Sequence, residues 1–458
     1  MQQIHSQLSS LRDFYDTGDT RPYHFRLQQL KNLKRIVLKY EQEIYDALYA
    51  DLKRSAEETW VTETGLVISE LNNAIRNLRR WMQPQSVPTN LVNLPSKSRI
   101  HHHPLGVVLI IGPWNYPFQL CIIPLIGAIA AGNCAVVKTS EFAPATTAIT
   151  KKIIEESFAE NFILHLEGDG AVVIPSMMKF FRFDHIFYTG NTAVGRKIYM
   201  AAAEKLIPVT LELGGKSPCV VESDANLDVA ARRIAISKFS NAGQMCVAPD
   251  YVLVHENVKD KFASRLQHTI NKFFGPDPQH AYGYGKIINK KQFDRISNYL
   301  QHASIYSGGK MNSEANYIEP TLILDPPLTS PLMKEEIFGP VLPIIGFSNS
   351  SQALDIIKAN PDPLAFYIFT SDSRKEKMWV DNVQFGGGCV NNTSWHLTNH
   401  HLPFGGIGNS GLGRYHGKSS FETFSHKKSL MKTPTWFDPM IKYPPFKGKL
   451  KLFKWIIR

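Results

Sequence analysis

The stretch from Gly106 to Val137, GVVLIIGPWNYPFQLCIIPLIGAIAAGNCAVV, decides the fold class of this chain. It contains an apolar strand candidate from Gly106 to Ile111, a helix candidate from Leu120 to Ala131 and a second strand candidate from Ala135 to Val137. A strand, a helix and a strand in this order are typical of a parallel βαβ unit, whose sheet is buried on both faces. The stretch therefore predicts an α/β fold.

The same alternation continues downstream and then starts again. The first set is extended by strand candidates at Phe162 to Leu166 and His185 to Tyr188, and by helix candidates at Ala145 to Ala159 and Ala193 to Lys205. A second set has strand candidates at Val209 to Leu213, Cys219 to Val221 and Tyr251 to Val254, and helix candidates at Val229 to Phe239 and Lys259 to Phe274. Two Rossmann-like parallel sheets in tandem are expected, preceded by a helical region in which Phe25 to Asp51 and Thr62 to Met82 show helical spacing of apolar residues.

Composition restricts the class of protein. The chain has 458 residues, 43% of them hydrophobic and 20% charged, which is typical of a folded protein with more than one domain. Five scattered cysteines do not form a disulfide framework, so a reducing cytoplasm is expected. Met1 to Arg21 lacks the apolar core of a signal peptide, and no window reaches about 18 consecutive apolar residues.

The net charge of +11 is concentrated in the C-terminal tail. Lys427 to Arg458 contains nine Lys and Arg residues against one Asp, a net +8. A general nucleic-acid surface requires a basic face on the folded body, so no nucleic-acid partner is expected.

Cys246 ends a stretch of mostly small residues, FSNAGQMC, that starts at Phe239. Glu212 opens a glycine-rich stretch upstream, ELGGK, that ends at Lys216. Small neighbours allow a substrate carbonyl to approach a thiol, and a carboxylate nearby can activate either the thiol or a water molecule. The alternative is a buried and inert cysteine, which is common for free thiols.

Asn115 lies between two prolines in GPWNYP, Gly112 to Pro117, directly after a strand candidate. An amide held this rigidly is a suitable donor to a developing oxyanion, although an asparagine there can also cap the following helix. Lys138 and Glu141 follow the next strand candidate, where charged groups can hold ribose hydroxyls or remain solvated at the surface.

TGNTAVG, Thr189 to Gly195, follows a strand candidate and opens a helix candidate. Backbone N–H groups at such a helix start bind pyrophosphate, although an ordinary strand-to-helix turn has the same pattern. The G-x-G-x-x-G match at Gly406 to Gly411 lacks both the preceding strand of a βαβ unit and a later acid, so it is not assigned to a dinucleotide.

Six ordered motifs make a resemblance specific. They are Pro113 to Pro117, Gly190 to Gly195, Glu212 to Lys216, Gly243 to Cys246, EEIFGP at Glu335 to Pro340, and Pro403 to Gly411. On these motifs the chain resembles the aldehyde dehydrogenase superfamily over nearly all its length, most closely the class 3 or fatty-aldehyde branch of bacterial type. The resemblance implies an aldehyde dehydrogenase-like fold, with cofactor and catalytic parallel-sheet domains and a small β bridging element for oligomerisation.

The resemblance also implies a mechanism. Cys246 would attack the aldehyde carbon, the Asn115 amide and the Cys246 backbone N–H would stabilise the oxyanion of the thiohemiacetal, and Glu212 would activate the water that hydrolyses the thioester. A carboxylate with a raised pKa suits that task. Since Glu212 is present, an acylating enzyme that keeps the thioester is disfavoured.

The cofactor implied is NAD, with NADP as the alternative. The residues expected around it are Trp114, Lys138, Glu141, Gly190, Asn191, Gly195, Glu336 and Phe338. Glu141 favours a free 2′-hydroxyl, whereas Lys138 can offset a 2′-phosphate. Asn191 stands where many members of the family carry Ser. No metal is expected, because the clustered histidines at His101 to His103 point to alternating faces of a strand.

By resemblance the chain divides into four parts. Residues 1–86 and 104–211 would form the NAD(P)-binding domain with its helical N-terminal region, and residues 212–395 the catalytic domain. Residues 87–103 and 396–440 would form the bridging element and C-terminal loop of a homodimer. Residues 441–458 would form a basic amphipathic tail.

The tail bears on substrate and location. From Phe446 to Arg458, apolar residues cover one side of a helical wheel and Lys or Arg most of the other, which is typical of an interfacial helix and also of a helix that packs on a subunit. We expect a cytoplasmic protein with peripheral contact at the inner face of the membrane, acting on a medium-chain, long-chain or otherwise apolar aldehyde. The alternatives are a dehydrogenase of a specific metabolic semialdehyde and a non-catalytic binding or structural protein on the same fold.

Overall fold

The structure is a computed structural model that describes residues 2–301 and 303–457, so Met1, His302 and Arg458 lie outside it. The N-terminal region is helical, as predicted. Its helices are α1 (Gln2–Thr17), α2 (Tyr23–Lys39), α3 (Glu41–Leu52), α4 (Ala56–Thr59) and α5 (Gly65–Met82), with a π-helical turn, η1 (Trp60–Thr64), between α4 and α5. Leu30, Leu33 and Ile36 of α2 are fully buried, because this apolar stripe faces the helices that cover the first sheet.

The first sheet has six strands in the order β17-β7-β6-β3-β4-β5. They are β3 (Val107–Ile111), β4 (Cys134–Lys138), β5 (Ile163–Leu166), β6 (His185–Thr189), β7 (Val209–Glu212) and β17 (Gly411–Leu412). All are parallel except β17, which pairs antiparallel with β7. Every residue of β3 and β4 is buried, which explains why these strands read as continuous apolar runs.

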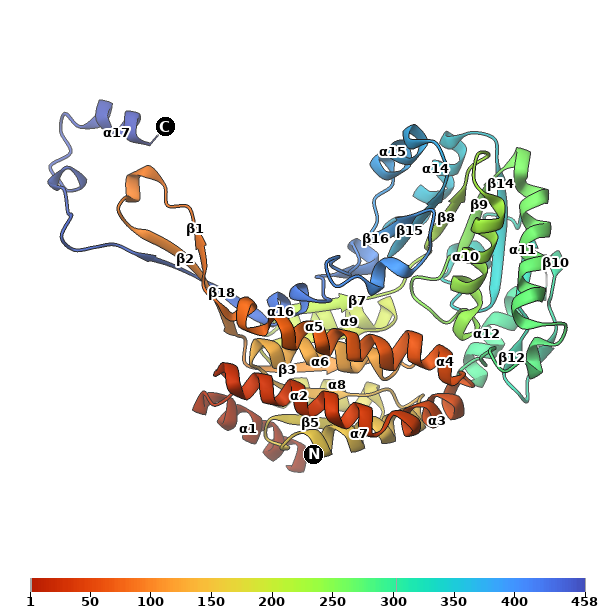
Figure 1. Cartoon of the computed structure of the whole chain (residues 1–458), viewed down its shortest axis with the longest axis horizontal. Coiled ribbons are helices and arrows are strands. Elements are labelled where there is room, and N and C mark those ends of the chain that lie inside the picture. The colour runs from red at the N-terminus through yellow and green to blue at the C-terminus, as the bar shows by residue number, and fades with distance from the viewer. Residues whose placement is uncertain (1, 302, 458) are drawn as a thin grey trace.

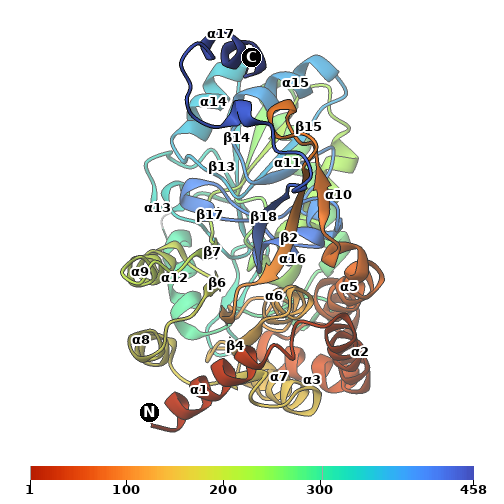
Figure 2. The same ribbon diagram turned by 90° about the vertical axis from the view of Figure 1, so that its left-hand side faces the viewer.

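Helices cover both faces of this sheet (Figures 1 and 2). They are α6 (Gln119–Ala131) and α7 (Pro144–Ser157) on one face, and α8 (Gly170–Phe180) and α9 (Thr192–Ala203) on the other. All residues of α6 are buried, because α6 is enclosed by the sheet, α2, α5 and α16 (Lys418–Thr423). The sequence did not predict α8, whose interior contains Pro175.

The assignment of Val209 to Leu213 to the second set of strands is wrong. Strand β7 pairs in parallel with β6, with Ile186 opposite Val209 and Thr189 opposite Glu212. The strand candidate alone does not say which sheet it joins, because both neighbours along the chain are parallel strands. Glu212 therefore stands at the carboxyl edge of the first sheet.

The second sheet has seven strands in the order β10-β13-β14-β9-β8-β15-β16. They are β8 (Pro218–Val221), β9 (Tyr251–His255), β10 (Ile305–Ser307), β13 (Thr321–Leu324), β14 (Val341–Phe347), β15 (Ala365–Phe369) and β16 (Gly387–Val390). Only β10 pairs antiparallel in this sheet. Its longer helices are α10 (Leu227–Phe239), α11 (Lys259–Phe274), α12 (Lys290–Leu300), α14 (Ser350–Lys358) and α15 (Ser373–Asn382), and a short hairpin pairs β11 (Met311–Asn312) with β12 (Tyr317–Ile318).

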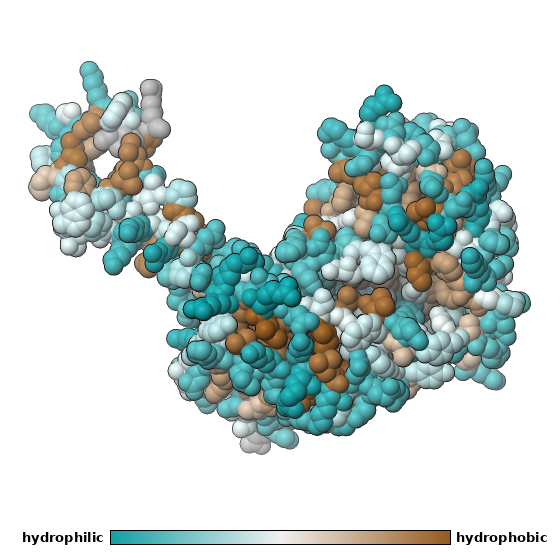
Figure 3. All heavy atoms as spheres, viewed as in Figure 1, coloured by the Kyte–Doolittle hydropathy of each residue, from teal (hydrophilic) through white to brown (hydrophobic). Residues whose placement is uncertain are grey.

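A three-stranded antiparallel sheet, β1-β2-β18, projects from the body (Figure 1). Its strands are β1 (Gln85–Val87), β2 (Lys97–Pro104) and β18 (Ser425–Lys432). The chain continues past β18 to α17 (Leu450–Ile456), a helix of seven residues that is shorter than the predicted tail. Apolar atoms lie exposed along this extension (Figure 3). Among the described residues, no helix is both long and apolar enough to cross a membrane.

The boundaries of the four parts predicted above stay predictions. The structure adds that the chain returns to the first sheet late, because β17 pairs with β7 and α16 packs on α6. A segment from late in the sequence thereby completes the first sheet beside the strand that carries Glu212.

Candidate active site

A cavity of about 720 Å³ lies between the two sheets. It is lined by residues that follow or end strands of the first sheet: Trp114 and Asn115 after β3, Gly190 and Asn191 after β6, and Glu212 in β7. Cys246, a few residues before β9, faces it from the other side. The carboxyl edge of a parallel sheet is where ligands bind in α/β proteins, so this cavity is the candidate active site.

The loop that carries Cys246 has a strained and crowded backbone. Asn241 and Ala242 adopt left-handed conformations, with φ of 49° and 50°. Gly243 follows with φ of +74°, and a Cβ there would lie 2.2 Å from the carbonyl oxygen of Gly339. Only glycine fits at this position, which accounts for the glycine of the GQMC motif. The left-handed conformations of Asn241 and Ala242 are backbone strain of the kind that clusters at functional sites.

The side chain of Gln244 connects this loop to the segment of residues 286–288. Its Nε2 donates to the main-chain oxygens of Asn241 and Lys286, each at 2.9 Å, and its Oε1 accepts from the N–H of Ile288 at 3.0 Å. The side chain is fully buried and uses both ends of its amide. Cys246 is therefore presented by a loop with little freedom to move.

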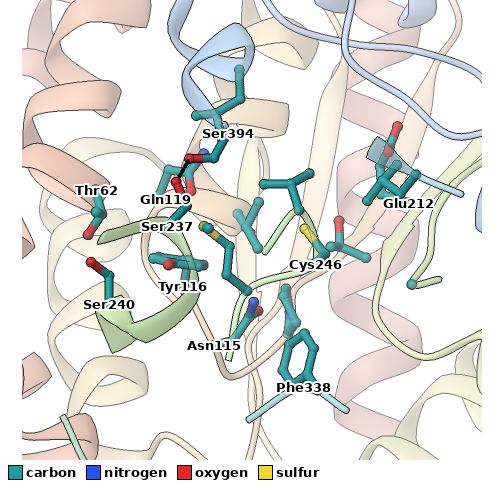
Figure 4. A pocket seen from close by; sticks show the side chains of 18 of the residues that line it. Thr62, Asn115, Tyr116, Gln119, Glu212, Ser237, Ser240, Cys246, Phe338 and Ser394 are labelled. Atoms are coloured by element: carbon teal, nitrogen blue, oxygen red, sulfur yellow. Dashed lines mark hydrogen bonds between the residues drawn. The ribbon is translucent and has the colours of Figure 1, made fainter. Parts of the chain in front are cut away.

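Asn115 is fixed beside the same loop. Its Nδ2 donates to the main-chain oxygen of Gln244 at 3.0 Å, and its side chain is 3% exposed. This hydrogen bond uses one of the two amide hydrogens, so the second remains available as a donor. In Figure 4, Cys246 lies between Asn115 and Glu212.

The electrostatics of the thiol depend on burial and on two carboxylates. Burial, together with the charges of Glu336 and Glu212, raises the pKa of Cys246 to about 12, while hydrogen bonds from the backbone N–H groups of Cys246 and Val247 partly oppose the shift. The thiol is therefore protonated at neutral pH, until a base or a positive charge arrives in the cavity.

Glu212 is a buried carboxyl group without a hydrogen-bond partner. Its side chain is 3% exposed, and neither carboxylate oxygen has a partner in the structure. Burial raises its pKa well above the usual range, and the charge of Arg414 lowers it in part. A carboxyl group of this kind, next to a thiol, is suited to taking a proton from water.

The N-terminal turn of α9 lies close to strands β6 and β7. Asn191 is its N-cap, and its Oδ1 accepts from the N–H of Val194 at 2.9 Å. A Cβ at Gly195 would lie 2.5 Å from a methyl group of Leu213, and a Cβ at Gly190 would lie 2.3 Å from the hydroxyl of Tyr188. The two glycines allow the helix to lie close to β6 and β7, and its N-terminus opens towards the cavity.

Glu336 faces the cavity from the second sheet. A Cβ at Gly214 would lie 1.9 Å from Oε2 of Glu336, so the glycine there makes room for the carboxylate. Burial and the charge of Asp250 together raise the pKa of Glu336 to about 8. A hydrogen bond from the Gly215 backbone partly offsets this rise.

The segment around Glu336 is held by charged side chains. Arg295 donates to the main-chain oxygens of Glu336 and Ile337, and Asp250 accepts from the N–H of Ile337 at 2.9 Å. Phe338 has φ of 45° and packs edge-on against Trp114, with ring centroids 5.3 Å apart. Two aromatic rings from different sheets thus meet in the cavity.

Lys138 and Glu141 form an ion pair after β4. Lys138 Nζ lies 2.6 Å from Glu141 Oε2, and Glu141 Oε1 accepts from the N–H of Gly170 at 3.1 Å. These contacts hold the pKa of Glu141 below its usual value although burial opposes the shift. This pair is not among the residues that line the described cavity, so it stands farther along the edge of the first sheet.

Sequence reasoning missed polar residues of the N-terminal helical region, of which Arg54 and Glu63 are buried behind the cavity and Glu58 lines it. Arg54 donates to the main-chain oxygen of Asn115 and to Glu63 in the π-helical turn, and Glu58 accepts from the N–H of Asn241 at 2.7 Å. Thr62 and Leu66 of the same helical region line the cavity. A capping signal is visible in Ser55 and Glu58, but nothing in the sequence shows that this helix faces the site.

The two parallel sheets and the cavity with its thiol, amide and carboxyl groups define an α/β enzyme with a cysteine in its cleft. The chain belongs to the aldehyde dehydrogenase family, whose model matches residues 3–430. It is 43% identical to the 4,4'-diaponeurosporen-aldehyde dehydrogenase of Staphylococcus aureus, over 98% of each chain. It is 40% identical to the dimeric, NADP-preferring aldehyde dehydrogenase of the dog, over 98% of this chain and 99% of the relative.

Solved structures agree with the sequence relatives. The substrate-bound state of Staphylococcus aureus AldH superposes with a TM-score of 0.96 at 42% identity, over 99% of each chain. An NADP complex of GapN from Methanocaldococcus jannaschii has a TM-score of 0.85 at 25% identity, over 94% of each chain, and an NAD+ complex of indole-3-acetaldehyde dehydrogenase has 0.84 at 25%, over 93% and 88%. The predicted family and fold are confirmed: the protein is an NAD(P)-dependent aldehyde dehydrogenase.

The residues present fit such a cofactor. The N-terminus of α9, brought close by Gly190 and Gly195, offers backbone donors to a pyrophosphate. Glu336, whose side chain accepts a hydrogen bond from the Gly215 backbone, lines the cavity beside the paired rings of Phe338 and Trp114, where a ribose can bind.

Proposed function

We propose that this enzyme oxidises apolar aldehydes to carboxylates through Cys246, with Asn115 as oxyanion donor and Glu212 as the base for water. The observation that carries the proposal is the convergence of these three groups on one cavity, each supplied by a different segment of the chain. No two of them are neighbours in sequence, so their meeting is a property of the fold.

The first step is attack of the Cys246 sulfur on the aldehyde carbon. A C–S bond forms, the thiol proton passes to water in the cavity, and the former carbonyl oxygen becomes an oxyanion. The free amide hydrogen of Asn115 and the backbone N–H of Cys246 donate to that oxygen, which stabilises the thiohemiacetal. When bound, NAD(P)+ would supply the hydride acceptor.

The oxyanion then collapses to a thioester as hydride leaves the carbon. Asn115 holds the oxygen throughout, because its amide is fixed on the Gln244 carbonyl. Glu212 takes a proton from water, the hydroxide adds to the thioester carbon, and the C–S bond breaks to release the carboxylic acid and regenerate Cys246. The burial of Glu212 makes it the stronger base for this step.

Cofactor contacts are assigned to the residues at the edges of both sheets. Gly190, Asn191 and Gly195 would hold the pyrophosphate, Glu336 the nicotinamide ribose, Phe338 and Trp114 the ring, and Lys138 with Glu141 the adenosine ribose. Glu141 carries a negative charge, since its pKa is lowered, and this supports a preference for NAD over NADP.

The apolar side chains that line part of the cavity support the proposal of an apolar substrate. Leu66, Leu120, Trp395, Leu397 and Phe404 all contribute apolar side chains to the cavity. Among the described residues that line it, Arg295 is the only Lys or Arg, and its guanidinium is used by the carbonyls of Glu336 and Ile337. A semialdehyde would need a free cation for its distal carboxylate. The relative from Staphylococcus aureus, named for a diaponeurosporenal substrate, agrees with an apolar aldehyde.

We also assign a homodimer and a membrane-facing tail to this enzyme. The projecting sheet β1-β2-β18 exposes Leu430 and Met431, and an exposed edge with apolar side chains favours pairing with a second subunit. The name of the dog relative includes the word dimeric. A cytoplasmic location with peripheral contact at the inner face of the membrane accords with the basic charge of the tail.

An aldehyde panel tests the chemistry. Straight-chain aldehydes of increasing length, an aromatic aldehyde and a semialdehyde are assayed for formation of NADH and NADPH. We expect kcat/KM to rise with chain length and to be lowest for the semialdehyde. Cys246→Ala should abolish turnover, and undiminished turnover in that variant would refute the role of the thiol. Faster oxidation of the semialdehyde than of every apolar aldehyde would refute the substrate class.

A further inference from the structure

The buried ion pair between Arg54 and Glu63 lies directly behind the proposed oxyanion donor. Both side chains are 0% exposed, and Arg54 Nη1 lies 2.9 Å from Glu63 Oε1. Arg54 follows α3, and Glu63 belongs to the π-helical turn Trp60–Thr64. Burying two charges is costly even when they pair, and π-helical turns are frequently found at functional sites. Both features indicate that the pair has a task besides stability.

The two charges hold the backbone of the Asn115 segment from both ends. Arg54 Nη2 donates to the main-chain oxygen of Asn115, and Glu63 Oε2 accepts from the N–H of Gln119 at 2.6 Å. The guanidinium also lies over the ring of Tyr116, 4.6 Å from its centroid. One ion pair therefore fixes the whole turn between β3 and α6 that contains Asn115.

A second tether connects the same helical region to the loop of the nucleophile. Glu58 Oε1 accepts from the N–H of Asn241 at 2.7 Å. Asn241 Nδ2 in turn donates to the main-chain oxygen of Asn115 at 2.9 Å. The carbonyl of Asn115 thus receives one donor from the N-terminal helices and one from the loop that presents Cys246.

The geometry points to Arg54 and Glu63 as positioning residues for aldehyde oxidation, which hold the Asn115 amide where charge develops on the substrate oxygen. Neither residue lines the described cavity, so neither contacts the substrate. The inference rests on the proposed role of Asn115. A misplacement of a catalytic group by about 1 Å costs on the order of a hundredfold in rate, so such a support affects catalysis without touching the reaction.

Lysine is the informative substitution at position 54. A guanidinium donates with two arms in a fixed fork, one to Glu63 and one to the Asn115 carbonyl, whereas an ammonium is a compact point charge. Arg54→Lys keeps the charge opposite Glu63 and removes the fork. We expect kcat/KM to fall about tenfold to a hundredfold, mainly through kcat.

A double-mutant cycle tests whether the loss passes through Asn115. Arg54→Lys and Glu63→Gln are each measured in the wild-type and in the Asn115→Ala background, with kcat and KM for a good aldehyde substrate and with thermal unfolding. In the Asn115→Ala background either substitution should change kcat by no more than about twofold, because the group that they position is gone. Arg26→Lys is the matched control, since Arg26 is 4% exposed and donates to the carbonyls of Thr20 and Ala130.

Each result decides one of the two claims. A normal kcat in Asn115→Ala alone overturns the proposed function. In a second case, Asn115→Ala is impaired, but Arg54→Lys and Glu63→Gln lower kcat by the same factor in both backgrounds. That result overturns the positioning role and leaves the proposed function intact. Loss of kcat in Arg26→Lys equal to that in Arg54→Lys also overturns the positioning role, because the effect then comes from destabilisation of the helical region.

Discussion

At the scale of single residues, Glu212 shows how far burial decides chemistry. It ends β7 with both oxygens unpartnered, and its pKa is raised well above the usual range by burial. Such a carboxyl group holds its proton more tightly than an exposed one and becomes a stronger base once ionised. The residue is therefore suited to the hydrolysis of the thioester and not to permanent activation of the thiol.

Replacement of Glu212 by Gln should separate the two halves of the reaction. In the proposed mechanism, oxidation to the thioester uses Cys246, Asn115 and the bound cofactor, whereas hydrolysis uses Glu212 as the base. We expect a burst of about one reduced cofactor per active site, followed by a steady rate about 10²-fold to 10⁴-fold below that of the wild type. Stopped-flow absorbance at the nicotinamide band measures both phases. Glu314→Gln at the exposed surface is the control, and a slow steady rate with no burst would assign Glu212 to the first half.

The same substitution has a signature in stability. Between the unfolded pKa of 4.5 and its raised folded value, Glu212 keeps a proton in the folded state that the unfolded state has lost, so its contribution to the free energy of unfolding falls as pH rises. Glu212→Gln removes this term. Its thermal unfolding temperature should match that of the wild type near pH 5 and exceed it at pH 8, and a constant difference across this range would contradict the raised pKa.

Motifs predict residues that chemistry requires but not the residues that support them. Cys246, Asn115 and Glu212 stand in distinctive stretches with glycines or prolines, because the backbone around them must turn sharply or allow close approach. Arg54 has no glycine or proline beside it, and Gly65, two residues after Glu63, belongs to no motif of this kind. The roles of Arg54 and Glu63 arise from contacts with the Asn115 segment about 60 positions away, and tertiary contacts of this range leave no local pattern.

At the scale of elements, the strands and helices of the first sheet were the most predictable part of the chain. β3 and β4 are buried on both faces, so their sequences are apolar except for Lys138 at the end of β4, and they are easy to recognise. The helix α8 was not predicted from the sequence, because Pro175 interrupts its helical pattern. Most strands after residue 274 were not predicted either, and several of them are only two to four residues long. The edge between β7 and β17 depends on a pairing of residues about 200 positions apart.

The turn between β4 and α7 should decide cofactor preference. Glu141 is held there by Lys138 and by the N–H of Gly170, and our proposal assigns the adenosine ribose to this pair. A 2′-phosphate would meet the negative charge of Glu141 at close range, where like charges cost several-fold or more in affinity. We expect Glu141→Gln to raise the ratio of kcat/KM for NADP to that for NAD about tenfold. Glu155→Gln on the exposed side of α7 is the control, and an unchanged ratio would place the ribose elsewhere.

At the scale of the whole molecule, the enzyme combines a rigid body with a projecting extension. The body consists of the two parallel sheets, which meet at the cavity and are joined through β17 and the loop of Cys246. The extension consists of β1-β2-β18 and the chain that follows it to α17. It exposes large apolar side chains, among them Trp436 at 77%, Met440 at 74% and Trp455 at 74%, in a segment that also holds most of the excess positive charge.

Exposed apolar residues beside lysines allow two outcomes for the tail. Leu450, Trp455 and Ile457 can insert into a membrane interface while Lys451 and Lys454 pair with anionic lipid, or the same apolar side can pack on the second subunit. The side chain of Ile456 and the whole of Arg458, which belong to the predicted amphipathic pattern, lie outside the described residues. The two outcomes differ in what removal of the tail changes.

Removal of the residues after Lys442 should abolish membrane binding and leave the dimer intact. The intact chain, the shortened chain and a variant with Gln in place of the lysines at 447, 449, 451 and 454 are sedimented with vesicles of anionic and of neutral lipid. Each lysine near an anionic surface contributes about 1 kcal/mol, so the intact chain should bind anionic vesicles most strongly and lose binding as salt is raised. Light scattering on the same three proteins without vesicles should give twice the mass of the respective chain, which is 51.7 kDa for the intact one. Equal sedimentation of the intact and shortened chains would refute the membrane role, and a monomer from the shortened chain would show that the apolar side of the tail packs on the partner subunit.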